Sequence, residues 1–170
     1  MSLETEARKL ALALEKKNLK IVFAESCTAG MVAATLAQTP GISRFLCGSA
    51  VVYRDATKSS WLGISKKILR SSGAVSRETA IAMARQVLRK TREADVAAAI
   101  TGDLGPLEDF KNAGIVFVAV ARRGRSNVSV KKFHLLPQRH SLGAKPALRL
   151  RIKRQALASQ SIISMVRSLL

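Results

Sequence analysis

The chain has 170 residues, of which 48% are hydrophobic and only 4% aromatic. This composition predicts a single α/β domain over residues 1–170, with a core of small aliphatic side chains. No apolar run approaches the roughly 18 residues of a membrane span, and the charged, helix-patterned N-terminus is unlike a signal peptide. We therefore expect a cytoplasmic protein with no membrane partner. Cys27 and Cys47 have neither metal-ligand nor disulfide spacing, and we expect no metal and no cofactor.

The charge is unevenly distributed. Lys and Arg number 29 against 11 Asp and Glu, a net charge of +18. Asp109 is the last carboxylate, and 13 basic residues follow it, whereas residues 1–110 carry a net charge of only +5. A basic half can bind nucleic acid, acidic lipid or a phosphorylated ligand. Because few aromatic side chains are present to stack on bases, nucleic acid is an open but disfavoured partner.

Hydrophobic periodicity predicts the elements of the first half in chain order. An amphipathic helix over 2–17 is stopped by Asn18. An apolar strand ends at Glu25, and the helix after it runs to about Gln38, where Thr39-Pro-Gly breaks it. A second strand over 45–53 leads to a short helix from Asp55 to a stop at Gly63. Residues 64–73 are predicted as a loop or a short helix.

The second half begins with the clearest helix, predicted over 77–92 with Ser76 as its cap. Residues 95–101, DVAAAIT, are predicted to form a buried central strand. Strands over 114–121 and 127–133 are joined by a hairpin signal. A last helix over 147–169 has a predicted core stripe of Ile152, Ala156, Ser159, Ile163 and Val166. The fold class is therefore α/β, a three-layer α/β/α sandwich with a mixed β-sheet in a single domain.

Side chains suited to chemistry follow the first strand. Glu25, Ser26, Cys27 and Thr28 occupy the turn between a buried strand and a helix, which is where α/β proteins place their sites. The unpaired N–H groups of the helix that follows can hold an oxyanion or a phosphate. The competing interpretation is a helix capped by Thr28 or Ser26, with no chemistry.

Ser26 needs a base to act as a nucleophile. His134 and His140 lie in the basic half, far from this turn, so a Ser-His-Asp triad is not predicted. Lys58, which closely follows the strand end at Tyr53, is the candidate base, because desolvation or nearby positive charge can lower a lysine pKa enough for it to act. The alternative is an ordinary exposed lysine. Cys27 is intrinsically the better nucleophile, but with no histidine to ionise it we interpret it as a packed neighbour.

Four sequence blocks carry a resemblance to a known family. AESCTAG, GSAVVYRDATK, GAVSRETAIAMA and ADVAAAITGDLGP occur in this order, and with them the chain resembles the CinA C-terminal domain family over about residues 6–166. That family includes nicotinamide mononucleotide amidases. The resemblance implies a hydrolase that converts nicotinamide mononucleotide and water to nicotinate mononucleotide and ammonia. Its catalytic residues would be Ser26 as nucleophile, Lys58 as general base, and Tyr53.

The resemblance also implies a set of substrate-binding residues: Glu25, Thr28, Thr101, Gly102, Gly105 and Arg149. The partner would be a small nucleotide substrate. Members of the family tend to self-associate, so a homo-oligomer such as a dimer is expected. Some relatives carry an additional N-terminal domain, and this chain is expected to be the stand-alone form because it begins directly with its own helix.

The chain also departs from the family pattern. Ala29 stands where the family has a glycine, and Asp55 stands where it has an asparagine, so that a carboxylate could hold Lys58 charged. The loop after Thr101 is shorter than in the family and carries three carboxylates that would repel a phosphate, Asp103, Glu108 and Asp109. Two alternatives follow. One is an amidase on a different amide, and the other is a catalytically lapsed domain that binds a polyanion through its basic half.

Overall fold

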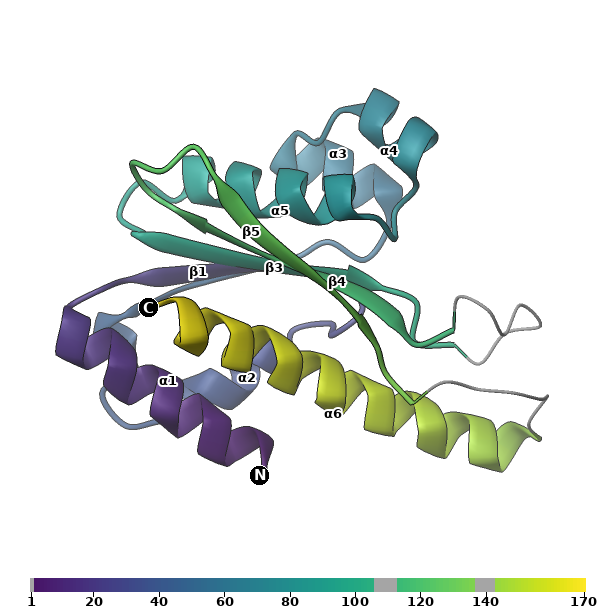
Figure 1. Ribbon diagram of the computed structural model, residues 1–170, viewed down its shortest axis with the longest axis horizontal. Coiled ribbons are helices and arrows are strands. Elements are labelled where there is room, and N and C mark those ends of the chain that lie inside the picture. Colours follow the sequence, from purple (N-terminus) through teal and green to yellow (C-terminus); the bar gives the residue numbers. More distant parts are fainter. Residues whose placement is uncertain (1, 106–112, 137–142) are drawn as a thin grey trace.

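The computed structural model is a five-stranded sheet with helices on both faces (Figure 1). It describes residues 2–105, 113–136 and 143–170. The strand order is β2-β1-β3-β4-β5. The strands are β1 (Ile21–Glu25), β2 (Leu46–Val51), β3 (Val96–Gly102), β4 (Ile115–Arg122) and β5 (Val128–His134). β1 pairs in parallel with β2 and β3, whereas β3–β4 and β4–β5 are antiparallel. The predicted mixed sheet is confirmed.

Six α-helices among the described residues form the two outer layers of the predicted sandwich. One face of the sheet is covered by α1 (Leu3–Lys17), α2 (Met31–Ala37) and α6 (Ala144–Leu169). The other face is covered by α3 (Asp55–Leu62), α4 (Lys66–Ser72) and α5 (Arg77–Lys90). A short 3₁₀ turn, Ile42–Arg44, precedes β2.

The core divides into two apolar clusters because side chains of a strand alternate between the faces of its sheet. In β1, Phe23 packs with α1, α2 and α6, while Val22 and Ala24 pack with α3, α4 and α5. β3 follows the same alternation with small residues, Ala97 and Ala99 on one face and Ala98 on the other. A central strand buried on both faces explains why its sequence is continuously apolar.

The structure decides between the two forms predicted for one segment and moves the start of another. Of the two forms predicted for residues 64–73, the short helix is confirmed as α4, because the Ser65 hydroxyl accepts a hydrogen bond from the Lys67 N–H and caps its start. The last helix begins at Ala144, before its predicted start, since Pro146 is tolerated in a first helical turn. The predicted place of Ile152 in the core stripe is wrong, because Ile152 is 54% exposed and Arg154 is buried instead.

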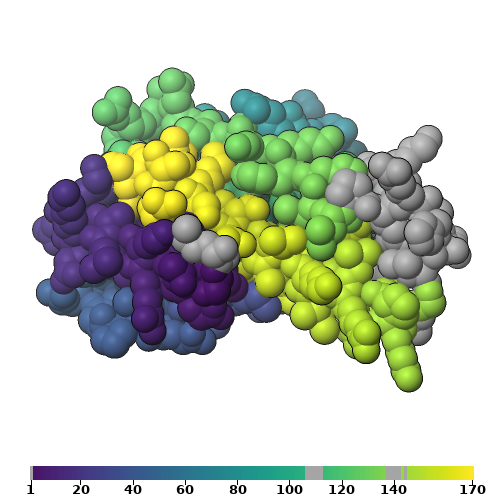
Figure 2. Space-filling model, turned by 60° about the horizontal axis from the view of Figure 1, so that its bottom comes forward, coloured from purple at the N-terminus to yellow at the C-terminus, as the bar shows by residue number. Residues whose placement is uncertain are grey.

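The first and last helices lie side by side (Figures 1 and 2). Their contact is polar as well as apolar. The buried carboxylate of Glu6 in α1 accepts hydrogen bonds from Ser164 Oγ at 3.1 Å and Arg167 Nε at 3.3 Å in α6. Among the described residues, no helix is both long enough and apolar enough to cross a bilayer.

Candidate active site

The carboxyl ends of the parallel strands meet at one edge of the sheet. Register places Glu25 between Val51 of β2 and Ile100 of β3. Beyond the strand, the Ser26 N–H donates to the Ile100 carbonyl at 3.1 Å, and the Val52 N–H donates to the Glu25 carbonyl at 2.8 Å. The turn that carries Ser26 is therefore held to the strands on both of its sides, as the sequence pattern predicts.

The Glu25 carboxylate organises this turn. It is fully buried and accepts five hydrogen bonds. The donors are the hydroxyls of Thr28 (2.7 Å) and Ser49 (3.0 Å) and the main-chain N–H groups of Gly30 (2.9 Å), Val32 (3.1 Å) and Ala33 (3.0 Å). A carboxylate here satisfies the unpaired N–H groups of α2 and the positive end of its dipole.

This arrangement corrects two expectations about α2. Neither Thr28 nor Ser26 caps the helix, because its N-cap residue is Gly30, which has no side chain to do so. The carboxylate of Glu25, five residues earlier, accepts the hydrogen bond from the Gly30 N–H instead. The N–H groups at the start of α2 are also not open to a phosphate or an oxyanion, because Glu25 already occupies them.

Hydrogen-bonding groups remain free immediately after the strand. Among the described residues, the N–H groups of Cys27 and Thr28 have no acceptor in another residue, and the Ser26 hydroxyl has no hydrogen-bond partner. The Ser26 side chain lies close to the surface, with 6% of the residue exposed. One turn thus offers a hydroxyl and two adjacent N–H donors, the elements of a nucleophile and an oxyanion hole.

Lys58 lies in the first turns of α3 and is only 1% exposed, so it is not an ordinary exposed lysine. Its Nζ donates to the Tyr53 carbonyl at 3.2 Å and lies 3.7 Å from Asp55 Oδ1. Burial lowers the Lys58 pKa from 10.5, and this effect outweighs the opposing influence of Asp55. Within the described part of the chain, the structure shows no hydrogen bond between Lys58 and Ser26. The Ser–Lys hypothesis requires that such a bond form during the reaction.

Cys27 is buried in the apolar cluster beside α2 and α6. Desolvation raises the pKa of its thiol to about 12, although Arg151 and Lys58 act in the opposite direction. Such a thiol remains protonated at neutral pH and is a poor nucleophile. Cys27 is therefore packed as predicted, and its lack of a catalytic role stays a prediction. Lys58 is linked to the Ser26 turn through the main chain, because its Nζ donates to the Tyr53 carbonyl and the preceding residue, Val52, donates its N–H to the Glu25 carbonyl.

Tyr53 and Thr101 make hydrogen bonds that connect neighbouring segments at this edge of the sheet. The Tyr53 carbonyl holds Lys58, and its hydroxyl accepts a 2.7 Å hydrogen bond from Arg151, with the residue 53% exposed. Thr101 is buried, and its hydroxyl donates to the Ala74 carbonyl at 2.7 Å, in the segment before α5. A role for either side chain in contacting substrate stays a prediction.

Gly102, the last residue of β3, and Gly105, in the loop that follows, lie in different surroundings. A Cβ on Gly102 would lie 2.4 Å from Val116 Cγ1 and 2.8 Å from the Ile115 carbonyl, so β4 excludes any larger residue there. Gly105 donates its N–H to Asp103 Oδ1 at 2.7 Å. The Asp103 carboxylate is therefore engaged within its own loop. The other two carboxylates expected near a phosphate, Glu108 and Asp109, lie outside the described residues, and substrate binding by Gly102 and Gly105 stays a prediction.

Helix α6 contributes residues that the sequence patterns did not single out. Arg151 donates to the Tyr53 hydroxyl and, at 3.3 Å, to the Gly105 carbonyl, and so joins the ends of β2 and β3. Gln155 donates to the Thr28 carbonyl at 3.0 Å. Arg151 and Gln155 are four residues apart and share one helix face, a spacing that could have identified them.

Two further arginines of α6 contrast with each other. The fully buried Arg154 donates to three main-chain carbonyls, at 3.1, 3.0 and 2.7 Å, those of Leu104, Leu135 and Leu136. Arg149 is exposed and makes no hydrogen bond or ion pair to the described residues, so its expected contact with ligand stays a prediction. Among the described residues, no group of three or more His, Cys, Asp or Glu is placed to hold a metal ion.

Comparison with known protein families shows to which family the chain belongs. A family model described as the CinA C-terminal domain matches residues 3–158. The chain belongs to the CinA C-terminal domain family. A CinA-like protein of Syntrophotalea carbinolica is 41% identical over 132 residues, which cover 76% of this chain and 32% of that protein. A CinA-like protein of Pseudothermotoga lettingae is 36% identical over 129 residues, 75% of this chain and 31% of that protein. The chain thus spans about a third of the length of the curated relatives it matches.

Solved CinA-family structures share the whole fold. The competence/damage-inducible protein CihA of Agrobacterium tumefaciens superposes with a TM-score of 0.84 at 29% identity, covering 98% of this chain and 94% of that one. A competence-damaged protein (CinA) superfamily protein of Escherichia coli gives a TM-score of 0.84 at 28% identity, covering 99% and 91%. These likenesses confirm the predicted fold class.

Proposed function

We propose that this CinA-family chain is an amidohydrolase that converts nicotinamide mononucleotide and water to nicotinate mononucleotide and ammonia. The observation that carries the proposal is the presence, at the same edge of the sheet, of a buried lysine of lowered pKa and a serine hydroxyl that has no hydrogen-bond partner among the described residues. Lysine can act as a general base only when it is neutral, and burial favours the neutral form.

The chemistry would proceed through an acyl-enzyme. Lys58 accepts the Ser26 proton as Ser26 Oγ attacks the carboxamide carbon, and the developing oxyanion is held by the N–H groups of Cys27 and Thr28. Lys58 then gives its proton to the departing nitrogen, the C–N bond breaks, and ammonia leaves. Water, activated by Lys58, hydrolyses the ester and restores Ser26. The absent Ser26–Lys58 hydrogen bond would form when substrate is bound, as catalytic hydrogen bonds often do.

Substrate recognition would come mainly from the α6 side of the edge. Arg151 reaches the ends of both β2 and β3 and offers a guanidinium suited to a phosphate. Arg149, exposed on the same helix, is a second candidate cation. Glu25 would act on substrate only indirectly, since its carboxylate is fully used in shaping the turn. Thr28, Thr101 and the two glycines would form the walls of the site.

The test is ammonia release from nicotinamide mononucleotide by the wild-type chain, Ser26→Ala, and a matched control, Ser71→Ala, which removes an exposed hydroxyl of α4. We expect Ser26→Ala to lose roughly a thousandfold or more in activity and Ser71→Ala to match the wild type. Full activity in Ser26→Ala would exclude the Ser–Lys mechanism. If the wild type is inactive on this substrate, a panel of non-phosphorylated and bulkier amides tests whether the altered loop has changed the substrate.

A further inference from the structure

Strand β5 forms an open edge of the sheet. It pairs with β4 on one side only. The Leu135 N–H donates to the Gly114 carbonyl at 2.8 Å, which sets the phase of the antiparallel ladder. Regular alternation then directs the main-chain groups of Val130, Lys132 and His134 away from β4. Within the described part of the chain these groups have no main-chain partner outside the ladder. The edge therefore offers alternating donors and acceptors to another extended chain.

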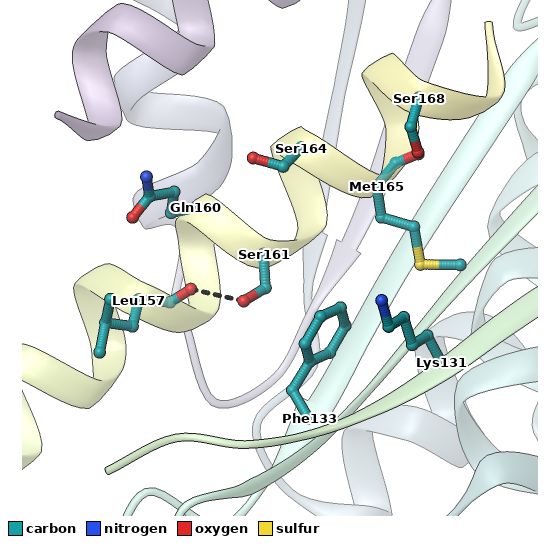
Figure 3. A pocket seen from close by; sticks show the side chains of 8 residues that line it. All are labelled: Lys131, Phe133, Leu157, Gln160, Ser161, Ser164, Met165 and Ser168. Atoms are coloured by element: carbon teal, nitrogen blue, oxygen red, sulfur yellow. Dashed lines mark hydrogen bonds between the residues drawn. The ribbon is translucent and has the colours of Figure 1, made fainter. Parts of the chain in front are cut away.

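A groove runs beside this edge on the α6 face of the sheet. Helix α6 packs against β3 and β4, and between it and β5 lies a hollow of about 370 Å³. Figure 3 shows Lys131 and Phe133 of β5 facing Ser161 and Met165 of α6 across this hollow. The Ser161 hydroxyl is already used within the helix, where it donates to the Leu157 carbonyl. The lining between strand and helix is mixed, with Phe133, Leu157 and Met165 as its apolar members.

The groove continues toward the β4–β5 hairpin. A second hollow of about 380 Å³ is lined by Ser129, two residues before Lys131 on the same face of β5, and by Leu169, at the end of α6. Figure 2 shows the C-terminal half of α6 (yellow) between α1 (purple) and the green surface of the β4–β5 region. Together the two hollows flank β5 along much of its length.

The charge of the groove has one sign. Lys131 borders the first hollow, and Arg122 and Arg125 border the second. No carboxylate side chain lines either hollow among the described residues. An occupant with acidic side chains would therefore be favoured over a neutral or basic one.

We propose that β5 and this groove bind an extended acidic segment of a partner protein, which adds to the sheet as a further strand. Its main chain would pair with the outward groups of β5, and alternate side chains would enter the groove, acidic ones at Lys131 and an apolar one against Phe133 and Met165. A second copy of this chain is a poorer occupant, because pairing β5 with β5 would bring Lys131 and Lys132 against like charges. Edge lysines also discourage self-pairing in general, but that role does not require a groove beside them.

The probe is a fluorescein-labelled heptapeptide, Thr-Glu-Thr-Leu-Thr-Glu-Thr, whose extended form presents a Glu-Leu-Glu face and a neutral face. Binding is measured by fluorescence anisotropy. Lys131→Glu should weaken binding at least tenfold. The matched control is Lys132→Glu, the same charge change on the same strand but on the opposite face, and it should change binding less than about threefold. Val130→Pro should abolish binding, because it removes an outward N–H while leaving the ladder to β4 intact.

Two modified peptides test the strand pairing itself. Each carries N-methyl groups on one of the two alternate sets of main-chain amides, and only the set that faces β5 should lose binding. The proposal would be overturned if the two N-methylated peptides bound equally well. It would also be overturned if Lys131→Glu and Lys132→Glu weakened binding of the unmodified peptide equally. Displacement of the peptide by oligo(dT) with the same Lys131 dependence, which indicates a polyanion site, would overturn it as well. If the wild-type protein self-associates in sedimentation velocity and Val130→Pro abolishes this association, the β5 edge binds a second copy of the chain instead. Thermal unfolding of each variant confirms that it is folded.

Discussion

Lys58 Nζ and the main-chain oxygen of Tyr53 are joined by a 3.2 Å hydrogen bond that fixes helix α3 to the segment leaving β2. A carbonyl can accept this bond without neutralising the lysine. The nearby carboxylate of Asp55 is 3.7 Å away, and its side chain is 56% exposed. Lys58 is thus held in a buried position with little compensation for its charge, which is why its pKa is lowered.

The pH dependence of activity should report this lysine. Only the neutral amine accepts a proton, so kcat/KM should rise with pH, with a midpoint below the ordinary lysine pKa of 10.5. Asp55→Asn removes the influences that raise the Lys58 pKa and should move the midpoint to lower pH. The pH–rate profiles of the two proteins check this. An unchanged midpoint in Asp55→Asn would show that another group controls the rate.

Lys58 should also lower the stability of the fold at neutral pH. Its folded-state pKa lies below its unfolded-state value, so the free energy of unfolding should increase as pH rises through the window between the lowered pKa and 10.5. Lys58→Met should therefore be more stable than the wild type by roughly 1 kcal/mol at pH 7 while losing activity. Urea denaturation at pH 7 and above pH 10.5 checks this, since the difference should shrink at the higher pH.

Substitution of Cys27 should leave most of the activity intact, whereas substitution of Ser26 should remove it. Because the Cys27 thiol is buried and its pKa is about 12, it should react slowly with iodoacetamide at neutral pH. Cys27→Ala should retain activity within about tenfold of the wild type, as expected for a residue that only packs. Mass spectrometry of the alkylated protein and ammonia release provide the two measurements. Loss of activity in Cys27→Ala, with Ser26→Ala still active, would identify the thiol as nucleophile.

Arg151 and Arg149 form a matched pair on α6 for testing substrate recognition. Arg151 contacts the Tyr53 hydroxyl and the Gly105 carbonyl, whereas Arg149 is exposed. Arg151→Met should lower kcat/KM at least tenfold, which corresponds to a loss of about 1.4 kcal/mol of transition-state binding. Arg149→Met should have a smaller effect. Steady-state kinetics decide between them, and the reverse order would restore Arg149 as the principal ligand residue.

Glu25 should be among the most sensitive positions for folding. Its carboxylate accepts hydrogen bonds from two hydroxyls and three main-chain N–H groups. Glu25→Gln turns one acceptor oxygen into a donor facing donors and should lower the free energy of unfolding by roughly 3 kcal/mol. The control is Glu15→Gln, which removes only the exposed ion pair with Arg44 and should change stability by less than about 1 kcal/mol. Comparable denaturation midpoints would contradict this role for Glu25.

Much of the fold could be predicted because local periodicity and turn signals agree with the final structure. Asn18 and Gly63 end α1 and α3 in left-handed conformations, as their residue types indicate. The clustering of Ser26, Tyr53 and Thr101 at one edge follows from parallel strand order. The task of Glu25 could not be predicted, because it depends on how the turn folds back to place a carboxylate against N–H groups up to eight residues away.

The first turns of α6 show a second limit. A hydrophobic stripe predicts a buried face only where something apolar covers it. Ile152 lies on an exposed part of the helix, whereas Arg154 meets the main-chain carbonyls of three residues beyond the strands. Those carbonyls lie outside the helix, that of Leu104 at 50 residues from Arg154, so no pattern within the helix could have indicated that an arginine would be buried there.

The contact between α1 and α6 has a consequence for biosynthesis. The apolar side of β1, β3 and β4 is closed partly by Ile162, Ile163 and Val166 of α6, which is translated after every strand of the sheet. A ribosome-bound chain that has already made the sheet would still expose that side to solvent. Chaperone contact and proteolytic sensitivity should therefore persist until α6 emerges, and premature termination within it should leave an aggregation-prone product rather than a shortened native protein.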